Sequence, residues 1–481
     1  MDNHLTNLKR FFLLFLIISK QKTREERLEE MCAATTTTLP EGRILAERVL
    51  KEAEDAYRRL PRKGKPEAGR EWSVAAAFVA GCADGTGLHT VALATGNKCV
   101  GGSAARAAHG GDVVLDGHAE VLARRALRRL LLDDARRLRA GEDTGVLLEW
   151  ADAEHTALRP RPDAHTLHLV VSAPPCGDSA VYCCSSTSGN TSTTNSETKE
   201  ETCNGEGDSH NKEEREEQGP ETKRARTGAW EGFHVTGARR TTGEQRVSVW
   251  EEEDGAVGAV GACRAKPGRG DPTLSMSCSD KIAMWACTGV QGALAGLILA
   301  SPLTLDTVVI CGGHGTPGET LTAMQAAAER ALINRVRAAA GTVLHTTVTV
   351  LPRSFEGVAE RADTLRAAGA GIVWHAGGFH EVVLTHMGKK LGTTRAKYNA
   401  PANCSEVAKR RLFDLYLQAS GTPAHSDKDK DDDKQQQEQH RMTYAEAKKA
   451  NTVFFAMKQR IKQQALTNWL PKLPSLDDFH L

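Results

Sequence analysis

Two tracts with very few large apolar side chains interrupt the chain and limit where a folded core can form. Residues 185–226 and 421–440 consist mostly of small polar, amide and charged residues. Such segments cannot bury enough apolar surface to offset the conformational entropy lost on folding. We therefore expect disordered insertions at about 185–226 and 421–440, a flexible leader at 1–40 that ends in a run of threonines, and one folded domain over 41–481.

The composition of the whole chain suits a globular protein with a sizeable core. Of the 481 residues, 40% are hydrophobic and 26% are charged. The formal net charge is +1, but residues 196–222 hold ten acidic and three basic side chains and residues 427–438 hold six and three, so about +11 remains for the rest of the chain. A basic body with acidic insertions is compatible with a phosphate-bearing partner, although charge alone does not identify one.

The cysteines and the leader bear on where the protein works. The 12 cysteines lack the dense, regular spacing of a small secreted disulfide-rich domain, so we expect a reducing compartment. The apolar run Phe11–Ser19 could be read as a weak signal peptide, but it is about half the length needed to span a bilayer and no small-residue cleavage site follows it. We expect a cytoplasmic or nuclear protein that is neither secreted nor embedded in a membrane, and nothing in the sequence indicates an obligate protein partner.

Short apolar runs alternate with segments of helical periodicity, which indicates an α/β fold. Buried strands are predicted at His168–Ser172, Thr307–Cys311 and Thr346–Leu351. The long, mostly apolar segment Ile282–Ala300 is predicted to be a buried helix.

The segment that follows Gly117 gives the clearest helical signal. Apolar residues recur in two neighbouring rows at i+4 spacing: Ala119, Ala123, Leu127 and Leu131 in one, and Leu122, Ala126 and Leu130 in the other. The opposite side carries four arginines, Arg124, Arg125, Arg128 and Arg129. A basic helix face is often simply solvated, so the residues alone leave its role open.

An imidazole and a carboxylate lie two residues apart at the start of this helix, in His118-Ala119-Glu120. At that spacing the two side chains diverge too much to bind one metal ion together easily, which favours a metal ligand and a separate proton carrier. The pattern alone is weak in a chain with 17 histidines.

Cysteines supply the remaining ligands that such a site would need. Cys176 follows a predicted strand and two prolines, in Pro174-Pro175-Cys176-Gly177. The zinc deaminase signature is H-x-E followed by P-C-x-x-C, but position 179 is Ser179, so a third ligand must come from elsewhere. The candidates are Cys183, Cys184 and, favoured by its place at the start of an apolar helix, Cys278, although any one of them could be a buried structural cysteine.

Several motifs resemble the deaminase domain of the adenosine deaminases acting on RNA, from about residue 50 to the C-terminus. The most specific are DGHAEVLARRALRRL (116–130), PPCGD (174–178) and KPGRGDPTLSMSCSDKIAMWACTGVQGAL (266–294), supported by LPRKGKPEAGREW (60–72), ATGNKCVG (94–101) and GKKLGTT (388–394). The resemblance implies a cytidine-deaminase-like mixed sheet flanked by helices, with a helical C-terminal part. It also implies zinc held by His118, Cys176 and Cys278, with Glu120 as the catalytic acid and base.

The same resemblance implies a second bound group, inositol hexakisphosphate, buried behind the active site. The matching positions are Arg124, Arg125, Lys281, Lys409, Tyr444, Lys448, Trp469 and Lys472. So many converging cations would be costly without a polyanion. On this interpretation Arg124 and Arg125 point inward, while Arg128 and Arg129 are surface residues. The chain departs from the family pattern at Met284, where the pattern has arginine, and at Leu115, where it has asparagine, so we expect weaker binding or a less charged inositol phosphate.

The substrate expected from the resemblance is tRNA, in particular the adenosine 3′ of the anticodon of tRNA-Ala. Messenger-editing members carry double-stranded-RNA-binding domains before the deaminase, and the roughly 70 residues before the catalytic block are too few and too irregular for one. The alternatives are a deaminase of messenger or duplex RNA, a deaminase of free nucleosides, and an inactive RNA-binding scaffold.

Overall fold

The computed structural model describes most of the chain, in seven segments: residues 39–142, 145–183, 233–234, 237–241, 260–268, 271–421 and 442–481. The expected leader at 1–40 and the expected insertions at 185–226 and 421–440 lie outside these segments, apart from residues 39, 40 and 421.

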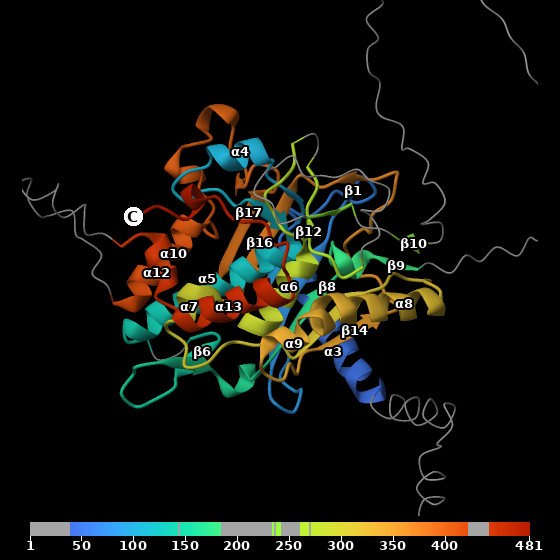
Figure 1. Cartoon of the computed structure of the whole chain (residues 1–481), viewed down its shortest axis with the longest axis horizontal. Coiled ribbons are helices and arrows are strands. Elements are labelled where there is room, and N and C mark those ends of the chain that lie inside the picture. Colours follow the sequence, from blue (N-terminus) through green and yellow to red (C-terminus); the bar gives the residue numbers. More distant parts are fainter. Residues whose placement is uncertain are drawn as a thin grey trace, which may run out of the picture.

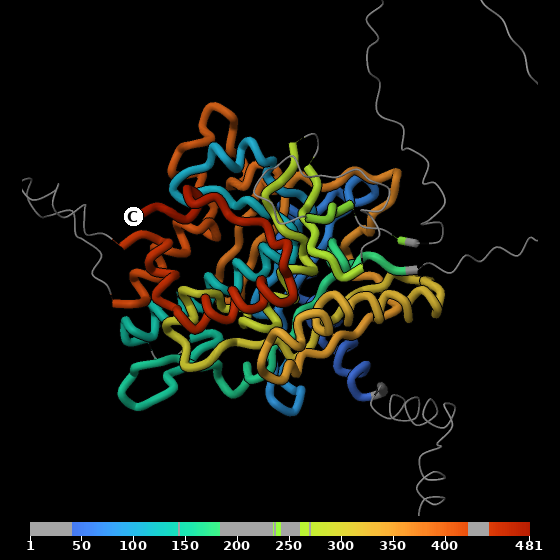
Figure 2. Tube along the Cα trace, in the orientation of Figure 1, coloured from blue at the N-terminus to red at the C-terminus, as the bar shows by residue number. Residues whose placement is uncertain are grey.

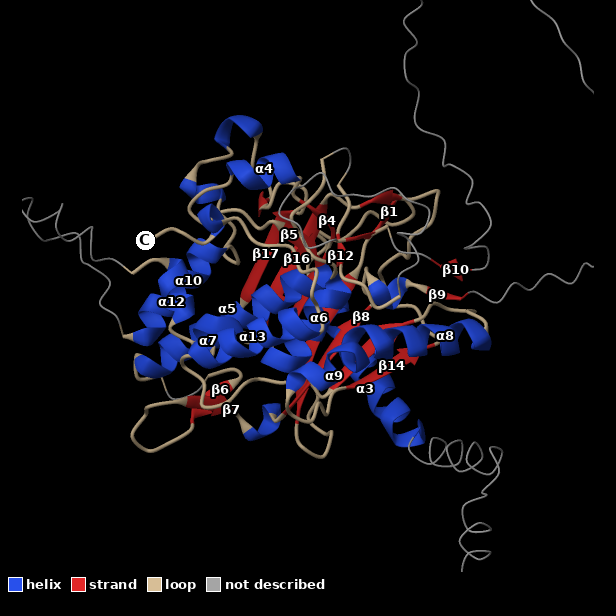
Figure 3. Ribbon diagram, viewed as in Figure 1, coloured by secondary structure: helices blue, strands red, loops and turns tan. Residues whose placement is uncertain are grey.

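A mixed eight-stranded sheet forms the centre of the molecule (Figures 1 and 3). Its strands, in spatial order, are β14 (Thr347–Leu351), β13 (Thr307–Cys311), β8 (Thr166–Val171), β2 (Ala75–Gly81), β3 (His89–Thr95), β16 (Ala370–His375), β17 (Phe379–Leu384) and β18 (Lys389–Lys390). The pairs among β14, β13 and β8 are parallel, and every pair from β8 to β18 is antiparallel.

Both faces of the sheet are covered, because strand side chains alternate between them. In β2, Ala76 and Phe78 belong to the core on one face, whereas Ala77 and Val79 belong to the core on the other. Helix α3 (Leu39–Arg59) packs on the second face. This two-sided burial explains why β2 reads as a continuous apolar run.

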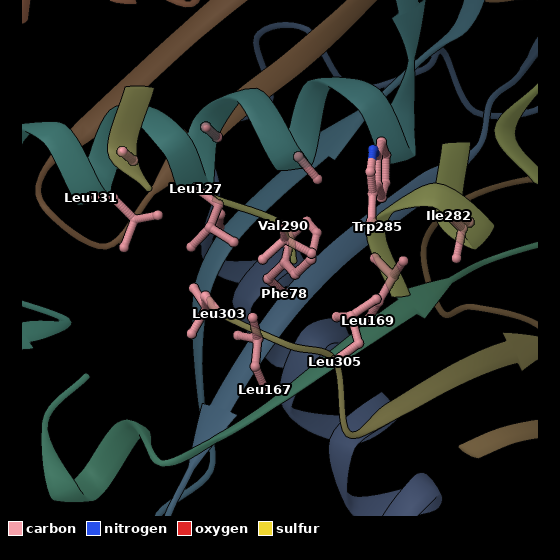
Figure 4. Close-up of a cluster of buried hydrophobic side chains, with 14 of the residues drawn as sticks. Phe78, Leu127, Leu131, Leu167, Leu169, Ile282, Trp285, Val290, Leu303 and Leu305 are labelled. Atoms are coloured by element: carbon pink, nitrogen blue, oxygen red, sulfur yellow. The ribbon is translucent and has the colours of Figure 1, made fainter. Parts of the chain in front are cut away.

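The first face carries most of the helices and the larger core. These helices are α5 (Ala119–Arg139), α6 (Cys278–Thr288), α7 (Gly292–Ala295), α8 (Gly318–Glu329), α9 (Arg335–Ala340), α10 (Lys409–Ser420), α12 (Tyr444–Lys449) and α13 (Thr452–Gln464). Figure 4 shows Leu127 and Leu131 of α5 above Leu167 and Leu169 of β8, with Trp285 of α6 beside them.

Shorter elements lie around the sheet. They are β1 (Glu71–Trp72), β4 (Asn97–Cys99), α4 (Gly102–Ala107), β5 (Asp116–His118), β6 (Leu148–Trp150), β7 (Leu158–Pro160), β9 (Tyr182–Cys183), β10 (Phe233–His234), β11 (Arg239–Arg240), β12 (Arg264–Ala265) and β15 (Arg366–Ala367). No helix among the described residues is long and apolar enough to cross a membrane.

The C-terminal part is helical and returns to the first face. Helix α13 packs against α6 and α9, and α12 packs against α7. In Figure 2 the last segment of the chain, in red, runs across the front of the molecule beside α5 and α6. Residues from the end of the chain thereby reach the helix that begins at Ala119.

The predicted α/β class and the three predicted strands are confirmed as β8, β13 and β14. The helix predicted after Gly117 is α5, and both of its apolar rows are buried. The single helix predicted over Ile282–Ala300 is wrong: α6 ends at Thr288, and α7 begins at Gly292. The break lies at Gly289, whose φ of 76° is left-handed and incompatible with a continuing helix.

Candidate active site and the cavity behind it

The start of α5 positions the first pair of functional side chains. Strand β5 runs directly into the helix, and His118 is the N-cap residue with extended backbone angles (φ −71°, ψ 145°). Asp116 fixes this turn, since its Oδ1 accepts a hydrogen bond of 3.0 Å from the His118 N–H. His118 and Glu120 therefore both lie at the start of α5, one as the N-cap and one in the first turn.

Two further chain segments bring cysteines to His118. Cys176 follows β8, and Cys278 is the first residue of α6. The His118 Nδ1 atom lies 3.8 Å from Cys176 Sγ and 3.7 Å from Cys278 Sγ. The three ligand atoms lie within 4.8 Å of one another, so they could hold a metal ion.

The separations fit zinc. A tetrahedral zinc ion at roughly 2.0–2.3 Å from its ligands requires neighbouring ligand atoms about 3.5–3.8 Å apart. The donor set of one imidazole and two thiolates suits this ion and leaves a fourth position open. A hydrogen bond from Cys278 holds the pKa of the Cys176 thiol well below its usual range, and the positive charges of Lys266 and His118 act in the same direction.

The sequence offered two other cysteines as possible third ligands. Cys183 belongs to β9, where it pairs with Phe233, and Cys184 lies outside the described residues. Cys99 forms a second possible group with Asp116 and His118. Asp116 is already bound by two lysines, however, so this second group is poorly suited to a metal ion.

Glu120 has the environment of a proton carrier. Glu120 is only 2% exposed, and its Oε2 atom has no hydrogen-bond partner among the described residues. Burial raises the pKa of Glu120. An ionisable oxygen without a protein partner, on the same helical turn as a metal-binding residue, is free to exchange protons with a bound substrate.

Lys266 connects the metal-binding group to the region behind it and was not identified from the sequence. Its buried Nζ lies 2.8 Å from both carboxylate oxygens of Asp116 and 3.1 Å from Cys278 Sγ. Lys281 contacts the Oδ2 atom of the same carboxylate. The only sequence signal was that Lys266 is the first residue of the motif KPGRGDP.

Asp116 and Lys281 also line a cavity of about 690 Å³. All eight residues expected to bind a polyphosphate line it: Arg124, Arg125, Lys281, Lys409, Tyr444, Lys448, Trp469 and Lys472. They come from α5, α6, α10, α12 and the last residues of the chain. Residues spread over about 350 positions of sequence thus meet in one space.

The cavity is more basic than the sequence indicated. Four further cations line it: Arg128, Lys449, Lys458 and Lys462. The expectation that Arg128 is a surface residue is therefore wrong, because the C-terminal segment covers this side of α5. Arg129, by contrast, lies over the Phe379 ring and near the Glu406 carboxylate, 3.6 Å away.

The pKa values of several of these cations are lowered, so their charged forms are less favourable in the cavity than in water. Burial, with the nearby charge of Arg128, lowers the pKa of Arg125 to about 10. Burial, together with Lys448 and Lys462, lowers the pKa of Lys458 to about 7. Asp477 compensates part of this charge by binding Lys409 Nζ at 2.7 Å and Lys448 Nζ at 2.6 Å. Cations still outnumber carboxylates in the cavity wall, so its chemistry fits a polyanion. Met284 and Leu115 also line the cavity, as apolar side chains.

Comparisons with known proteins agree with this architecture. Residues 92–473 match the family model described as the adenosine-deaminase (editase) domain. The tRNA-specific adenosine deaminase 1 of Mus musculus is 28% identical over 509 residues, covering 88% of this chain and 96% of that protein. The protein of the same name from Drosophila melanogaster is 27% identical over 461 residues, covering 94% of this chain and 99% of that protein.

A relative with a different name matches a smaller part of this chain. The double-stranded RNA-specific editase Adar of Drosophila melanogaster is 25% identical over 225 residues, which are 46% of this chain and 26% of that protein. The family model spans well over half of the chain and includes every element that supplies His118, Glu120, Cys176 and Cys278. The chain therefore belongs to the adenosine-deaminase (editase) domain family.

Proposed function

We propose that this protein is a zinc-dependent hydrolase that converts adenosine to inosine in tRNA. The observation that carries the proposal is the meeting of His118, Cys176 and Cys278 beside the buried, unpartnered carboxylate of Glu120 in a member of the editase family. The relatives that cover most of the chain bear the name tRNA-specific adenosine deaminase 1.

The residues divide the chemistry between them. Zinc bound by His118, Cys176 and Cys278 would supply an activated water at its open position. Glu120 accepts a proton from the attacking water and passes it to N1 of the adenine ring, so that C6 becomes electrophilic. Glu120 then takes the second proton from the oxygen newly bonded to C6 and delivers it to the amino group, which leaves C6 as ammonia, and the product is inosine.

Replacing Glu120 tests this division of roles. Glu120→Gln keeps the size of the side chain but removes its capacity to carry a proton, so we expect conversion to fall at least about a hundredfold with zinc content unchanged. Sequencing of treated tRNA measures conversion, and metal analysis measures zinc. The matched control is Glu319→Gln, at an exposed position of α8, which should leave both readouts at the wild-type level. Loss of zinc from Glu120→Gln would make Glu120 a ligand and contradict the assignment.

The preferred substrate that we propose is the adenosine 3′ of the anticodon in tRNA-Ala. A base in an anticodon loop is unpaired, so it reaches a buried site at low cost, whereas a base in a duplex must first be flipped out. The test compares unmodified tRNA-Ala, other tRNAs and a long RNA duplex as substrates. Conversion confined to tRNA-Ala beside the anticodon supports the proposal, and conversion mainly of the duplex would assign the protein to messenger editing instead.

We also propose that the basic cavity holds inositol hexakisphosphate. Ten of the twelve residues described above are cations and come from several helices. The lowered pKa values of Arg125 and Lys458 indicate that positive charge lacks compensation there. Because Leu115 and Met284 offer no charge, we expect weaker retention or a less phosphorylated inositol. Ion chromatography of the supernatant from denatured, purified protein should detect about one inositol phosphate per chain. Active protein that releases none would overturn the proposal.

The domain organisation and location follow as proposals from the same chemistry. We propose that 41–481 form the catalytic domain, with 1–40 as a leader. The protein would work in the cytoplasm, the nucleus or both, since the thiols of Cys176 and Cys278 must stay reduced to bind zinc. Fractionation of cells that express the tagged protein tests the location.

A further inference from the structure

The two metal-binding cysteines are followed by the same unusual feature. In each case the second residue after the cysteine is an aspartate that is 0% exposed: Asp178 after Cys176, and Asp280 after Cys278. Neither carboxylate contacts the metal-binding atoms or the basic cavity described above. A fully buried carboxylate is stable only with charged and hydrogen-bonding partners, so the partners indicate what each aspartate does.

Each aspartate is bound by a different arginine. The Arg330 Nε donates to Asp178 Oδ2 at 3.1 Å, and its Nη2 donates to the carbonyl oxygens of Asp178 and Val181, both at 3.0 Å. Arg335 Nη2 lies 2.8 Å from Asp280 Oδ1, and the Arg335 side chain is 8% exposed. The guanidinium groups therefore bind the segments that carry the cysteines, not the cysteines themselves.

The remaining oxygens of both aspartates are also satisfied. Asp178 Oδ1 accepts a hydrogen bond of 2.7 Å from the Gly261 N–H. Asp280 Oδ2 accepts from the Ser277 hydroxyl at 2.6 Å and from the Arg264 N–H at 2.9 Å. Both oxygens of Asp178 are thus held by hydrogen bonds. Asp280 is held by hydrogen bonds at Oδ2 and by the ion pair with Arg335 at Oδ1, so the orientation of each carboxylate is fixed.

A helical irregularity places the two arginines. They lie at the ends of a π-helical turn, Arg330–Asn334 and the residue after it, between α8 and α9, and the Arg335 N–H donates to the Arg330 carbonyl. In a regular α-helix, residues five apart are separated by about 140° beyond a full turn. The π turn bonds residues five apart across one turn, so Arg330 and Arg335 can serve neighbouring partners.

The two cysteine segments also touch each other directly. The Ser279 N–H donates to the Cys176 carbonyl at 3.0 Å, and the Cys278 N–H donates to Cys176 Sγ at 3.4 Å. A Cβ atom on Gly177 would lie 2.3 Å from Ser277 Oγ, so the segments approach as closely as glycine allows. Any displacement of one segment would change the distance between the two sulfur atoms.

We propose that Arg330 and Arg335 are positioning residues that set the separation of the two metal-binding thiols. They hold the Cys176 and Cys278 segments through Asp178 and Asp280, and the π turn couples the two contacts. Groups that orient metal ligands typically contribute 10–100-fold to metal affinity. This inference rests on the metal site proposed above and adds a device that sets its geometry.

The experiment compares metal retention by folded variants. Arg330→Gln removes the guanidinium group that binds the Cys176 segment. Arg335→Lys keeps a positive charge near Asp280 but loses the planar guanidinium. Arg337→Gln, at an exposed position of α9, is the matched control. Zinc release into a chelator is followed over time, thermal unfolding establishes that each variant is folded, and the thiolate-to-cobalt absorption of the Co²⁺-substituted protein reports ligand geometry.

We expect Arg330→Gln and Arg335→Lys to release zinc at least about tenfold faster than wild type, with an altered Co²⁺ spectrum, while Arg337→Gln matches wild type. Folded variants that release zinc within about twofold of the wild-type rate, with an unchanged spectrum, would overturn the positioning role of Arg330 and Arg335 and leave the metal site intact. Wild-type protein that binds neither zinc nor Co²⁺ would overturn the metal site itself, and the positioning role with it.

Discussion

Lys458 is one side chain of the basic cavity whose pKa is lowered into an accessible pH range. Its pKa is lowered to about 7 by burial and by Lys448 and Lys462, from an ordinary value of 10.5. Between these values the unfolded chain binds a proton that the folded, anion-free chain does not, so the free energy of unfolding rises with pH over this window. Lys458→Met should therefore stabilise anion-free protein, more at pH 7 than at pH 9.

Thermal unfolding of both proteins at pH 7, 8 and 9 measures this difference. Bound inositol hexakisphosphate favours the charged ammonium, so its addition should abolish the pH dependence. A difference between wild type and Lys458→Met that stays constant with pH in anion-free protein would contradict the role assigned to Lys458.

Single residues also show what a sequence can and cannot reveal. His118, Glu120, Cys176 and Cys278 could be proposed together because the motifs around them resemble those of a known family, although the His-x-Glu pattern and any single cysteine are weak signals on their own. Lys266 was not, because its role depends on Asp116, which is 150 positions away in the chain and becomes its partner only in the folded state. The positioning arginines have no motif either, since a π turn has no sequence signature that spacing alone reveals.

At the scale of elements, a side chain of α8 hydrogen-bonds free backbone groups of the edge strand β14. Gln325 Nε2 donates to the Val348 carbonyl at 2.7 Å, and its Oε1 accepts from the Val350 N–H at 2.8 Å. Because β14 is an outer strand of the sheet, Gln325→Ala would leave both backbone groups available to another chain.

We expect Gln325→Ala to lower the free energy of unfolding by about 1 kcal/mol and to cause association that increases with protein concentration. Urea unfolding and light scattering measure the two effects. Thr322→Ala, at an exposed position of the same helix, should stay within about 0.5 kcal/mol of wild type. If Gln325→Ala behaves like this control, the amide does not protect the edge.

The elements that could be predicted are those whose own residues determine them. The valine- and leucine-rich strands β8 and β13 and the two-row helix α5 fall in this group. The alanine-rich run Ala75–Gly81 forms a central strand although alanine favours helices, because burial on both faces overrides propensity. The break at Gly289 was missed because glycine inside an apolar run does not by itself distinguish a helix end from a tolerated glycine.

At the scale of the whole molecule, an anion in the basic cavity would hold together segments that are distant in sequence. Protein stripped of inositol phosphate should therefore unfold at lower temperature than protein to which inositol hexakisphosphate is restored. At a free concentration 100 times the dissociation constant, the gain is about 2.7 kcal/mol. Differential scanning calorimetry measures it, and inorganic phosphate at equal ionic strength is the control. Equal stabilisation by phosphate would indicate general screening instead of a bound polyanion.

The cavity wall combines α5 with residues 469–478, so its two sides come from segments that the ribosome makes at widely separated times. The space cannot exist before residues 469–478 have been synthesised, so an anion that binds there would be enclosed only afterwards. If the cavity holds an inositol phosphate, as proposed, maturation of the protein would require segments that are far apart in the sequence to capture a small soluble metabolite together. Cells in which that metabolite is scarce would accumulate full-length chains that have not completed this step.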